Sequence, residues 1–361
     1  MARLRLGVIG SGDVVFRFYL PALTGQSARV ELVGVSDRRL EAAERAAYEV
    51  RSWSPDVLAF DSTEGLLSAA KPQAVVNLTP APVHAPVTSE CLRAGAHVFS
   101  EKPLAGSMAE ADALIEEARR NRLTLLCAPA SALTRQVRWL AELVASGELG
   151  RPTLASAQVA SMGPAAWAEY TGDPTVHYSR DVGPVADLGI YRRHELTAIL
   201  GPVRSVQAAG SIAIPRRTIV AGPLAGSEVE VTAPDHVLID LEFAGGALGR
   251  LMASFATPAS LAPWLEIQLT EGAISLSRGE HRNDGPVSVF RDGEWRHGLT
   301  TPGPPDPLPV VGLGIPHFVD CIEGKAQPVL TAEHARHVLE LILAAEQSIA
   351  DGRRHTLSTS F

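Results

Sequence analysis

Cysteine is scarce in this sequence of 361 residues. The three cysteines, Cys91, Cys127 and Cys321, are widely spaced, and no two of them form a CxxC pair. This spacing predicts neither a disulfide framework nor a structural zinc site, so buried thiols are the simpler interpretation. The paired histidines His334 and His337 also lack an evident third ligand, and we expect no metal site.

Long apolar runs are missing as well. The first apolar run is interrupted by Gly10, Gly12 and Asp13 well before it reaches the length of a signal-peptide core, and no later window is apolar enough for a membrane span. These features predict a soluble, cytoplasmic protein.

The sequence has no excess of positive charge: 32 basic residues stand against 40 acidic ones, for a net charge of −8. Nucleic acid and anionic membrane surfaces are therefore not expected as partners. With 46% hydrophobic and 20% charged residues, the chain has enough material for two packed cores.

Short apolar runs alternate with helical patterns over the first 128 residues. The runs are rich in Val, Ile and Leu, as suits strands buried on both faces, and lie at residues 4–10, 30–36, 74–78, 97–99 and 123–127. Helical patterns between them include a capping box, Ser107 with Glu110, that opens a helix. This alternation predicts an α/β domain with a doubly wound parallel sheet over residues 1–128.

The remainder of the chain, residues 129–361, has a different pattern. Apolar and polar residues alternate along 238–243 and 247–255, and Asp292-Gly293 is a strong type I′ hairpin signal. We expect an α+β substrate-binding domain with a largely antiparallel open sheet. One face carries Asp240 and Arg250 and should meet solvent or a partner subunit, which favours a homodimer or homotetramer.

A glycine turn follows the first predicted strand. Gly10 and Gly12 would let the backbone approach a pyrophosphate, although Val15 stands where a GxGxxG motif has its third glycine. Asp37 ends the second strand, where a carboxylate can accept both ribose hydroxyls of NAD. Arg38 beside it could instead pair with a 2′-phosphate, so NAD is expected and NADP stays open.

These features, together with NLTPAPVHAPV at 77–87, AGAHVFSEKPLAGS at 94–107 and LGIYRRHELTAILG at 188–201, resemble the glucose-fructose oxidoreductase, inositol dehydrogenase and rhizopine-catabolism (Gfo/Idh/MocA) family. The resemblance implies a Rossmann domain and hydride transfer between NAD(P) and a carbinol or keto carbon of a sugar, polyol or related small molecule. It also implies these cofactor-binding residues: Gly10, Gly12, Asp13, Val14, Asp37, Arg38, Thr79, Pro80, His84, Glu101 and Lys102.

Lys102 lies in the Glu-Lys-Pro tripeptide directly after a predicted strand. Ligands of this fold bind beyond the carboxyl ends of the strands, and a partly desolvated ammonium can donate or share the proton of a substrate hydroxyl. We therefore predict a catalytic role for Lys102. The resemblance further suggests a cis peptide bond between Lys102 and Pro103.

A helix predicted at about 187–200 places Asp187, Tyr191 and His194 on one face. The family commonly has a histidine as proton carrier at the position of Tyr191. Its sugar-oxidoreductase and dihydrodiol-dehydrogenase branches are similar to this sequence in using a tyrosine there. We expect Lys102 and Tyr191 to pair at the substrate hydroxyl, with Asp187 orienting the sugar and His194 as a substrate contact or spare proton carrier. Asp187 as a helix cap and His194 as a packing residue are the alternatives.

Two other functions fit the same sequence. The first is an enzyme that retains NAD and oxidises a sugar transiently to eliminate a glycosidic group. The second is a non-catalytic dinucleotide-binding regulator, against which Lys102, Asp187 and Tyr191 argue together, because a regulator needs no proton relay. The loop at 164–181, with Trp167, Tyr170, His177 and Tyr178, is long enough for a pocket wall, yet its aromatic residues could equally be packing residues.

Overall fold

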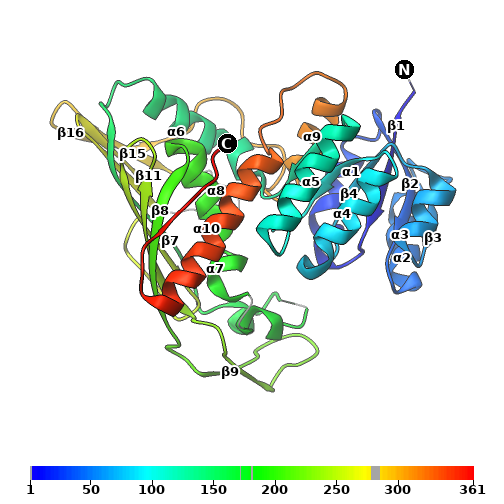
Figure 1. Cartoon of the computed structure of the whole chain (residues 1–361), viewed down its shortest axis with the longest axis horizontal. Helices are drawn as coiled ribbons and strands as arrows, with labels where there is room; N and C mark the ends of the chain where they lie inside the picture. The colour runs from blue at the N-terminus through cyan, green and yellow to red at the C-terminus, as the bar shows by residue number, and fades with distance from the viewer. Residues whose placement is uncertain (1, 171, 180–181, 278–284) are drawn as a thin grey trace. The chain divides into compact units, whose positions relative to one another are not determined.

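The computed structural model describes residues 2–170, 172–179, 182–277 and 285–361. The chain divides into two compact units. The first unit contains the residues up to Leu133 and the later segment Pro307–Leu339, and the second contains Thr134–Asp306 and Glu340–Phe361 (Figure 1).

The first unit is built on a six-stranded parallel sheet with the order β3-β2-β1-β4-β5-β6. This finding confirms the predicted doubly wound sheet, and the order is that of a dinucleotide-binding fold. The side chains of β4 are all buried, as expected for a parallel strand covered on both faces. The strands are β1 (Leu4–Ile9), β2 (Val30–Ser36), β3 (Leu58–Phe60), β4 (Ala74–Asn77), β5 (His97–Ser100) and β6 (Leu125–Cys127).

Helices connect these strands and pack on the sheet. The strand order runs outward from β1 in both directions, so right-handed crossovers put the helices of the two halves on opposite faces. The predicted capping residue Ser107 precedes α5, and its Oγ accepts a hydrogen bond from the N–H of Glu110. The α-helices of this half of the chain are α1 (Leu20–Thr24), α2 (Leu40–Val50), α3 (Thr63–Gly65), α4 (His84–Arg93) and α5 (Met108–Asn121).

The segment Pro307–Leu339 returns to the first unit. Its helix α9 (Gly314–Ile322) packs on β5, and the rings of Phe318 and Phe99 lie 5.9 Å apart. The guanidinium of Arg29 binds the carboxylates of Asp320 and Glu323 from the same segment. The sequence predicts two domains, residues 1–128 and 129–361, and this division stays a prediction. The compact units differ from it in this segment because its apolar face is buried against β5.

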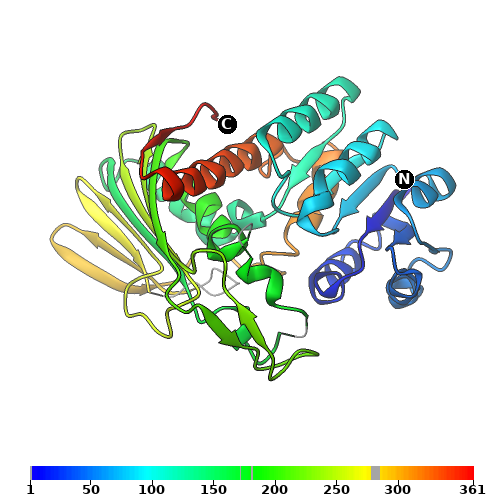
Figure 2. The same cartoon turned by 60° about the horizontal axis from the view of Figure 1, so that its bottom comes forward.

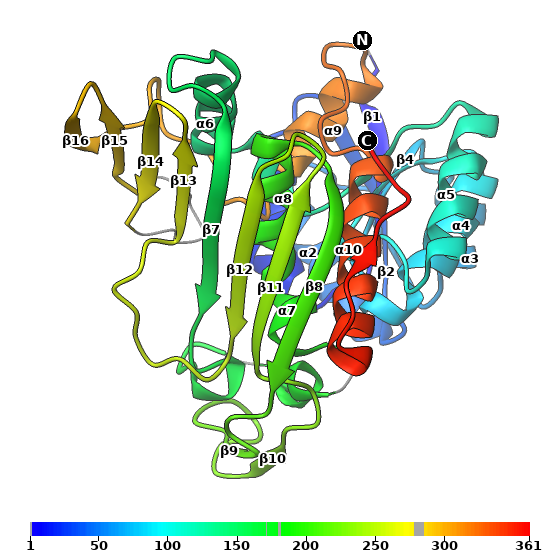
Figure 3. The same ribbon diagram turned by 60° about the vertical axis from the view of Figure 1, so that its left-hand side comes forward.

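The second unit contains a mixed, mostly antiparallel sheet of nine strands, ordered β16-β15-β14-β13-β7-β12-β11-β8-β17 (Figure 3). In the described part of the chain, β7 and β12 pair in parallel and the other neighbours pair antiparallel. Asp292 and Gly293 both have positive φ, 56° and 85°, which confirms the predicted type I′ turn. The strands are β7 (Pro152–Ala160), β8 (Val203–Ser211), β11 (His236–Phe243), β12 (Leu248–Ser254), β13 (Leu265–Leu269), β14 (Gly272–Leu276), β15 (Val287–Arg291), β16 (Glu294–Leu299) and β17 (His355–Thr356).

Helices cover one face of this sheet. α8 (Gly189–Leu200) packs on β7 and β12, and α6 (Arg135–Ala145) packs on α8. The red C-terminal helix α10 (Ala332–Asp351) runs beside β8 in two views (Figures 2 and 3), where the Oγ of Ser348 accepts the N–H of Ala208 over 2.8 Å. Residues 332–339 of α10 belong to the first unit. A two-stranded sheet of β9 (Arg216–Thr218) and β10 (Glu228–Glu230) and the short helix α7 (Gly183–Asp187) complete the second unit.

The other face of the large sheet carries the predicted polar residues. Arg250 lies opposite Asp240 in the register of β11 and β12, and its Nε donates to Oδ1 of Asp240 over 2.9 Å. These residues line a hollow of about 380 Å³ together with Leu154, Leu248 and Arg354. None of the helices in the described part of the chain is both long and apolar enough to cross a membrane.

Candidate active site

The predicted cofactor residues of the first unit gather at one edge of its sheet, because the carboxyl ends of parallel strands lie together. Gly10 follows β1 with a φ of 92°. A Cβ at this position would lie 2.6 Å from the carbonyl oxygen of Leu78 and 2.8 Å from the nitrogen of Thr79, after β4. Glycine is therefore required both for the backbone conformation and for the close approach of two chain segments.

Asp37 joins the acid after β2 to the glycine turn. Its Oδ2 accepts the backbone N–H of Ser11 over 2.8 Å, and its Oδ1 accepts the N–H of Arg39 over 3.0 Å. The side chain is 16% exposed. A carboxylate oxygen can accept two hydrogen bonds, so Asp37 keeps acceptor capacity beyond these two N–H groups.

Thr79 and His84 belong to a buried hydrogen-bond network behind the same edge. The Oδ1 of Asn77 accepts the hydroxyl of Thr79 over 2.7 Å, and its Nδ2 donates to the carbonyl of His84 over 3.0 Å. The ring nitrogens of His84 contact the carbonyl oxygens of Thr79, at 2.6 Å, and Pro103, at 2.8 Å. His84 thus ties the loop that contains Pro80 to the loop that contains Lys102.

Lys102 follows the end of β5 and is half-buried. The Oε2 of Glu101 accepts the backbone N–H of Lys102 over 2.9 Å, while its Oε1 accepts the hydroxyl of Tyr19 over 2.5 Å. The peptide bond between Lys102 and Pro103 is cis, as the resemblance suggested, and the bond between Ala128 and Pro129 is cis as well. Glu101 therefore fixes the backbone of the lysine rather than pointing away from the turn.

The glycine turn has the features that a dinucleotide phosphate requires. The buried hydroxyl of Ser11 has no hydrogen-bond partner in the described structure, and open space surrounds the position that a Cβ on Gly12 would take. Ser11 was missed by the sequence reasoning, although its place between two predicted glycines could have indicated it. The side chain of Asp13 binds Arg17 over 3.1 Å, and Val14 and Arg38 are exposed.

In the second unit the predicted single helix at 187–200 is wrong at its start. Asp187 ends α7, and Tyr191 and His194 lie on α8, with Leu188 between the two helices. The reason is that Pro184 occupies the first turn of α7, where proline is favoured, instead of preceding a helix. Tyr191 is half-buried and His194 is 3% exposed.

The side chain of Arg193 connects these two helices. It is fully buried, its Nη1 donates to the carbonyl of Val185 over 2.6 Å, and burial lowers its pKa to about 10. A Cβ on Gly189 would lie 3.0 Å from the same nitrogen, so the glycine makes room for the guanidinium. The position of Asp187 relative to Tyr191 therefore depends on the side chain of Arg193, which is adjacent in the sequence to neither of them.

The aromatic loop brings a histidine to Asp187. Nδ1 of His177 lies 3.3 Å from Oδ2 of Asp187, and Nε2 lies 2.9 Å from the hydroxyl of Tyr170. The sequence left these residues open between a pocket wall and packing, and with nine residues between His177 and Asp187 no periodicity indicated the contact. Thr171, Arg180 and Asp181 of this loop lie outside the described residues.

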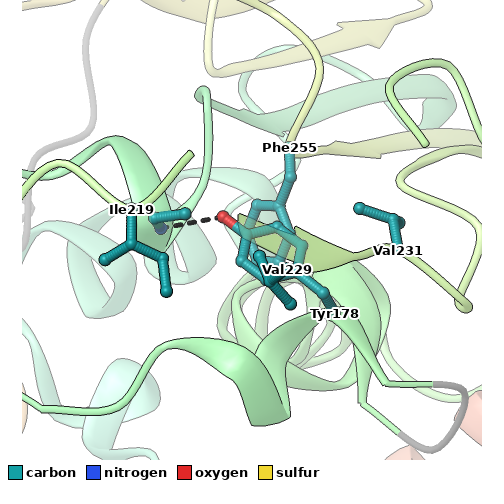
Figure 4. Close-up of a cluster of buried hydrophobic side chains, with 6 residues drawn as sticks. Tyr178, Ile219, Val229, Val231 and Phe255 are labelled. Atoms are coloured by element: carbon teal, nitrogen blue, oxygen red, sulfur yellow. Dashed lines mark hydrogen bonds between the residues drawn. The ribbon is translucent and has the colours of Figure 1, made fainter. Parts of the chain in front are cut away.

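Tyr178 anchors the same loop in a small apolar core (Figure 4). Its hydroxyl accepts the N–H of Ala165 over 2.8 Å, and its ring meets that of Phe255 at 5.8 Å between centroids. The guanidinium of Arg217, which is bound to Asp235 over 2.6 Å, lies over the phenol ring at 5.1 Å from its centroid. The core also contains Ile219, Val229 and Val231 from the β9 and β10 region.

Comparison with known proteins agrees with this arrangement. Residues 4–128 match the model of the oxidoreductase family with an NAD-binding Rossmann fold, and residues 137–275 match the Gfo/Idh/MocA C-terminal domain. The chain belongs to the Gfo/Idh/MocA family. It is an NAD(P)-dependent oxidoreductase.

Several relatives have assigned activities. The enzyme is 29% identical over 320 residues to a dTDP-3,4-didehydro-2,6-dideoxy-alpha-D-glucose 3-reductase of Streptomyces violaceoruber, with 82% of this chain and 86% of the relative covered. It is 28% identical over 208 residues to a D-glucoside 3-dehydrogenase of Escherichia coli, with 57% of each covered. The WlbA dehydrogenase of Bordetella pertussis, solved with NADH and UDP-GlcNAcA, shares the fold at 19% identity and a TM-score of 0.75, over 99% of this chain and all of that one.

One cysteine lies beside the site, because the Sγ of Cys127 is 3.8 Å from the carbonyl oxygen of Glu101. Cys91 and Cys127 are buried, as expected, and burial raises the pKa of both thiols, while Cys321 is half-buried. Burial, followed by the neighbouring His337, lowers the pKa of His334 to about 3. Within the described ranges, no group of three or more His, Cys, Asp or Glu side chains is arranged to hold a metal ion.

Proposed function

We propose that this enzyme transfers a hydride between NAD and C3 of a hexopyranose ring, either free or carried on a nucleotide or glycoside. The support for C3 is that two relatives, one covered over most of its length, are named as a sugar 3-reductase and a glucoside 3-dehydrogenase. The observation that carries the proposal is the position of Lys102, held by Glu101 after β5 at the edge where Gly10 and Asp37 also lie.

NAD is the proposed cofactor, with Asp37 as the group that reads its ribose. The Ser11 and Arg39 N–H groups hold this carboxylate beside the glycine turn, where it would repel a 2′-phosphate. Arg38 and Arg39 are the residues that would pair with a 2′-phosphate if NADP were used. When bound, the nicotinamide supplies the two-electron chemistry, and the protein supplies orientation and proton transfer.

For the proton we propose the pair of Lys102 and Tyr191. A tyrosine has a reference pKa near 10 and needs a neighbouring cation to act near neutral pH. A lysine ammonium at the substrate hydroxyl would provide that cation. Asp187 would hydrogen-bond the sugar and orient it, while His194 would be a second substrate contact.

The quaternary structure and the location stay predictions. A homodimer or homotetramer would cover the sheet face that carries Asp240 and Arg250, and light scattering on the eluted protein would measure it. A cytoplasmic location is expected from the sequence alone.

The test is nicotinamide absorbance over time with the purified protein and NAD or NADP. The panel contains nucleotide-linked hexoses, alkyl glucosides, free aldoses and inositols, each offered as the alcohol and, where available, as the 3-keto compound. Turnover with hexose derivatives and not with 3-deoxy analogues would support the proposal. Turnover with inositols alone would contradict the choice of C3. Cofactor binding without any net change in absorbance, but with release of an aglycone, would indicate the eliminating enzyme instead.

A further inference from the structure

Asp187 is one end of a chain of three polar side chains in the second unit. The imidazole of His177 lies between the carboxylate of Asp187, 3.3 Å from Nδ1, and the hydroxyl of Tyr170, 2.9 Å from Nε2. Nδ1 is buried and makes no hydrogen bond of good geometry in the described structure, so the carboxylate is its available partner after a small rotation of the ring. The side chains of His177 and Asp187 are 18% and 14% exposed, and Tyr170 is half-buried.

The surrounding structure holds this chain in place. His177 precedes Tyr178, whose ring is fixed in the apolar core of Figure 4 and beneath Arg217. The tyrosine and histidine rings of the chain meet edge to face, with centroids 5.7 Å apart and an interplanar angle of 84°. Asp173 caps the turn that contains His177 by accepting the N–H of Thr175 over 2.8 Å. A residue anchored in this way has few conformations, as a positioning residue requires.

We propose that Tyr170, His177 and Asp187 form a proton relay that serves the substrate-side carboxylate. His177 acts through Asp187. During oxidation of the substrate the ring starts as the Nε2–H tautomer, and its unprotonated Nδ1 accepts the proton that the carboxylate has taken up. Nε2 then releases its proton to the hydroxyl of Tyr170, which passes its own proton to water. This inference rests on the proposed function, because it needs Asp187 to face the sugar.

Oxidation of the carbinol breaks a C–H bond, whose two electrons leave with the hydride to the nicotinamide, and an O–H bond, whose proton remains to be removed. Tyr191 and Lys102 are the first to hold that proton in the proposed mechanism. Transfer through Asp187, His177 and Tyr170 to solvent returns Tyr191, Lys102 and Asp187 to their resting protonation state and leaves the ring as the Nδ1–H tautomer. From this tautomer the reverse path delivers a proton during reduction, and exchange of the ring proton with water restores the Nε2–H tautomer for another oxidation.

The decisive variant is His177→Ala, assayed with the sugar that the wild-type enzyme turns over. We expect kcat to fall about tenfold to a hundredfold, toward the lower end of the range for a lost proton-transfer group, with KM for NAD changed by less than about threefold. Added imidazole should restore much of kcat, since it can occupy the space of the missing ring. Tyr170→Phe, which keeps the aromatic packing, should lower kcat in the same direction. His355→Ala removes a matched histidine, 3.1 Å from Asp351, and should leave kcat unchanged.

An unchanged kcat in both His177→Ala and Tyr170→Phe would overturn the relay. A loss that imidazole does not restore would likewise overturn it, because it would show packing rather than proton transfer.

A wild-type enzyme that shows no turnover with any sugar would overturn the proposed function, and nitrogen NMR of the histidine rings then tests the relay. Asp187→Asn should shift the ring nitrogens of His177, identified by their loss in His177→Ala, and leave those of His355 in place. Unshifted His177 signals would refute the relay independently of activity.

Discussion

The backbone N–H of Ser11 donates to Oδ2 of Asp37 over 2.8 Å, so the turn after β1 and the acid after β2 are linked by a hydrogen bond. The carboxylate that would read the ribose is thereby fixed to the backbone that would cradle the pyrophosphate. A change at either position should consequently affect cofactor binding at the other.

Replacing Asp37 should change cofactor preference. Asp37→Ser removes the negative charge that repels a 2′-phosphate, while Arg38 and Arg39 remain beside it. We expect the ratio of kcat/KM for NADP to that for NAD to rise by about tenfold, which corresponds to about 1.4 kcal/mol. Steady-state kinetics with both cofactors measure this ratio. Asp56→Ser, at an exposed turn, is the control, and an unchanged ratio in Asp37→Ser would show that the ribose is recognised elsewhere.

Gly10 and Gly12 form a matched pair for substitution by alanine. The change should lower stability at Gly10 and weaken cofactor binding at Gly12. Gly10→Ala places a methyl group against the Leu78 carbonyl at positive φ, and we expect a loss of about 1–3 kcal/mol in the free energy of unfolding. Gly12→Ala meets open space and should change stability by less than about 0.5 kcal/mol.

Denaturant titration and NAD titration separate the two effects. Gly12→Ala should weaken dinucleotide binding, since its methyl group occupies the space that a phosphate would fill. Equal stability losses in both variants would mean that the Gly12 position is packed rather than open.

Lys102→Ala tests the proton-transfer assignment. We expect turnover to fall by about 10² or more, because a group that donates or shares the substrate proton is lost. The Kd for the dinucleotide, measured by fluorescence quenching, should stay within a few-fold. Lys325→Ala, whose side chain is exposed and binds Glu323, should turn over as the wild type does. Normal turnover in Lys102→Ala would remove this lysine from the mechanism.

The carboxyl of Glu323 should make the free energy of unfolding depend on pH in the acid range. Its hydrogen bond from Arg29, joined by Lys325, lowers the pKa of the carboxyl to about 2 from an ordinary value of 4.5. Since the folded-state pKa is the lower one, the ionised carboxylate stabilises the fold above about pH 4.5, and this contribution disappears as the pH falls toward 2. The Tm difference between the wild type and Glu323→Gln should therefore narrow over that window. A difference independent of pH would exclude the ion pair as its source.

Much of the first unit, and one hairpin turn of the second, could be predicted from the sequence because their signals are local. The capping box at Ser107 and the turn at Asp292-Gly293 depend on neighbouring residues, and buried parallel strands have a distinctive composition. The cis bond before Pro103 came from family resemblance. The start of the helix at residue 187 was placed wrongly because Pro184 fits the first turn of a helix as well as the end of a loop.

The contacts around Asp187 could not be predicted for a different reason. His177 reaches the carboxylate only because Tyr178 is anchored against Phe255, more than seventy residues away in the sequence. Similarly, Arg193 is buried over a glycine in the preceding turn, and no periodicity of α8 indicates a buried arginine. Packing between segments far apart in the chain decides both arrangements.

The return of Pro307–Leu339 to the first unit has a consequence for biosynthesis. The ring of Phe318 packs on that of Phe99 on β5, the strand that leads to Lys102, so this part of the core is incomplete until the ribosome has made the chain as far as Phe318. The strands of the first unit emerge early, yet α9 reaches them only after every strand of the large sheet except β17 has been synthesised. The nascent chain therefore exposes apolar surface next to its lysine while the residues between β5 and α9 are being synthesised, when chaperones have the opportunity to bind it.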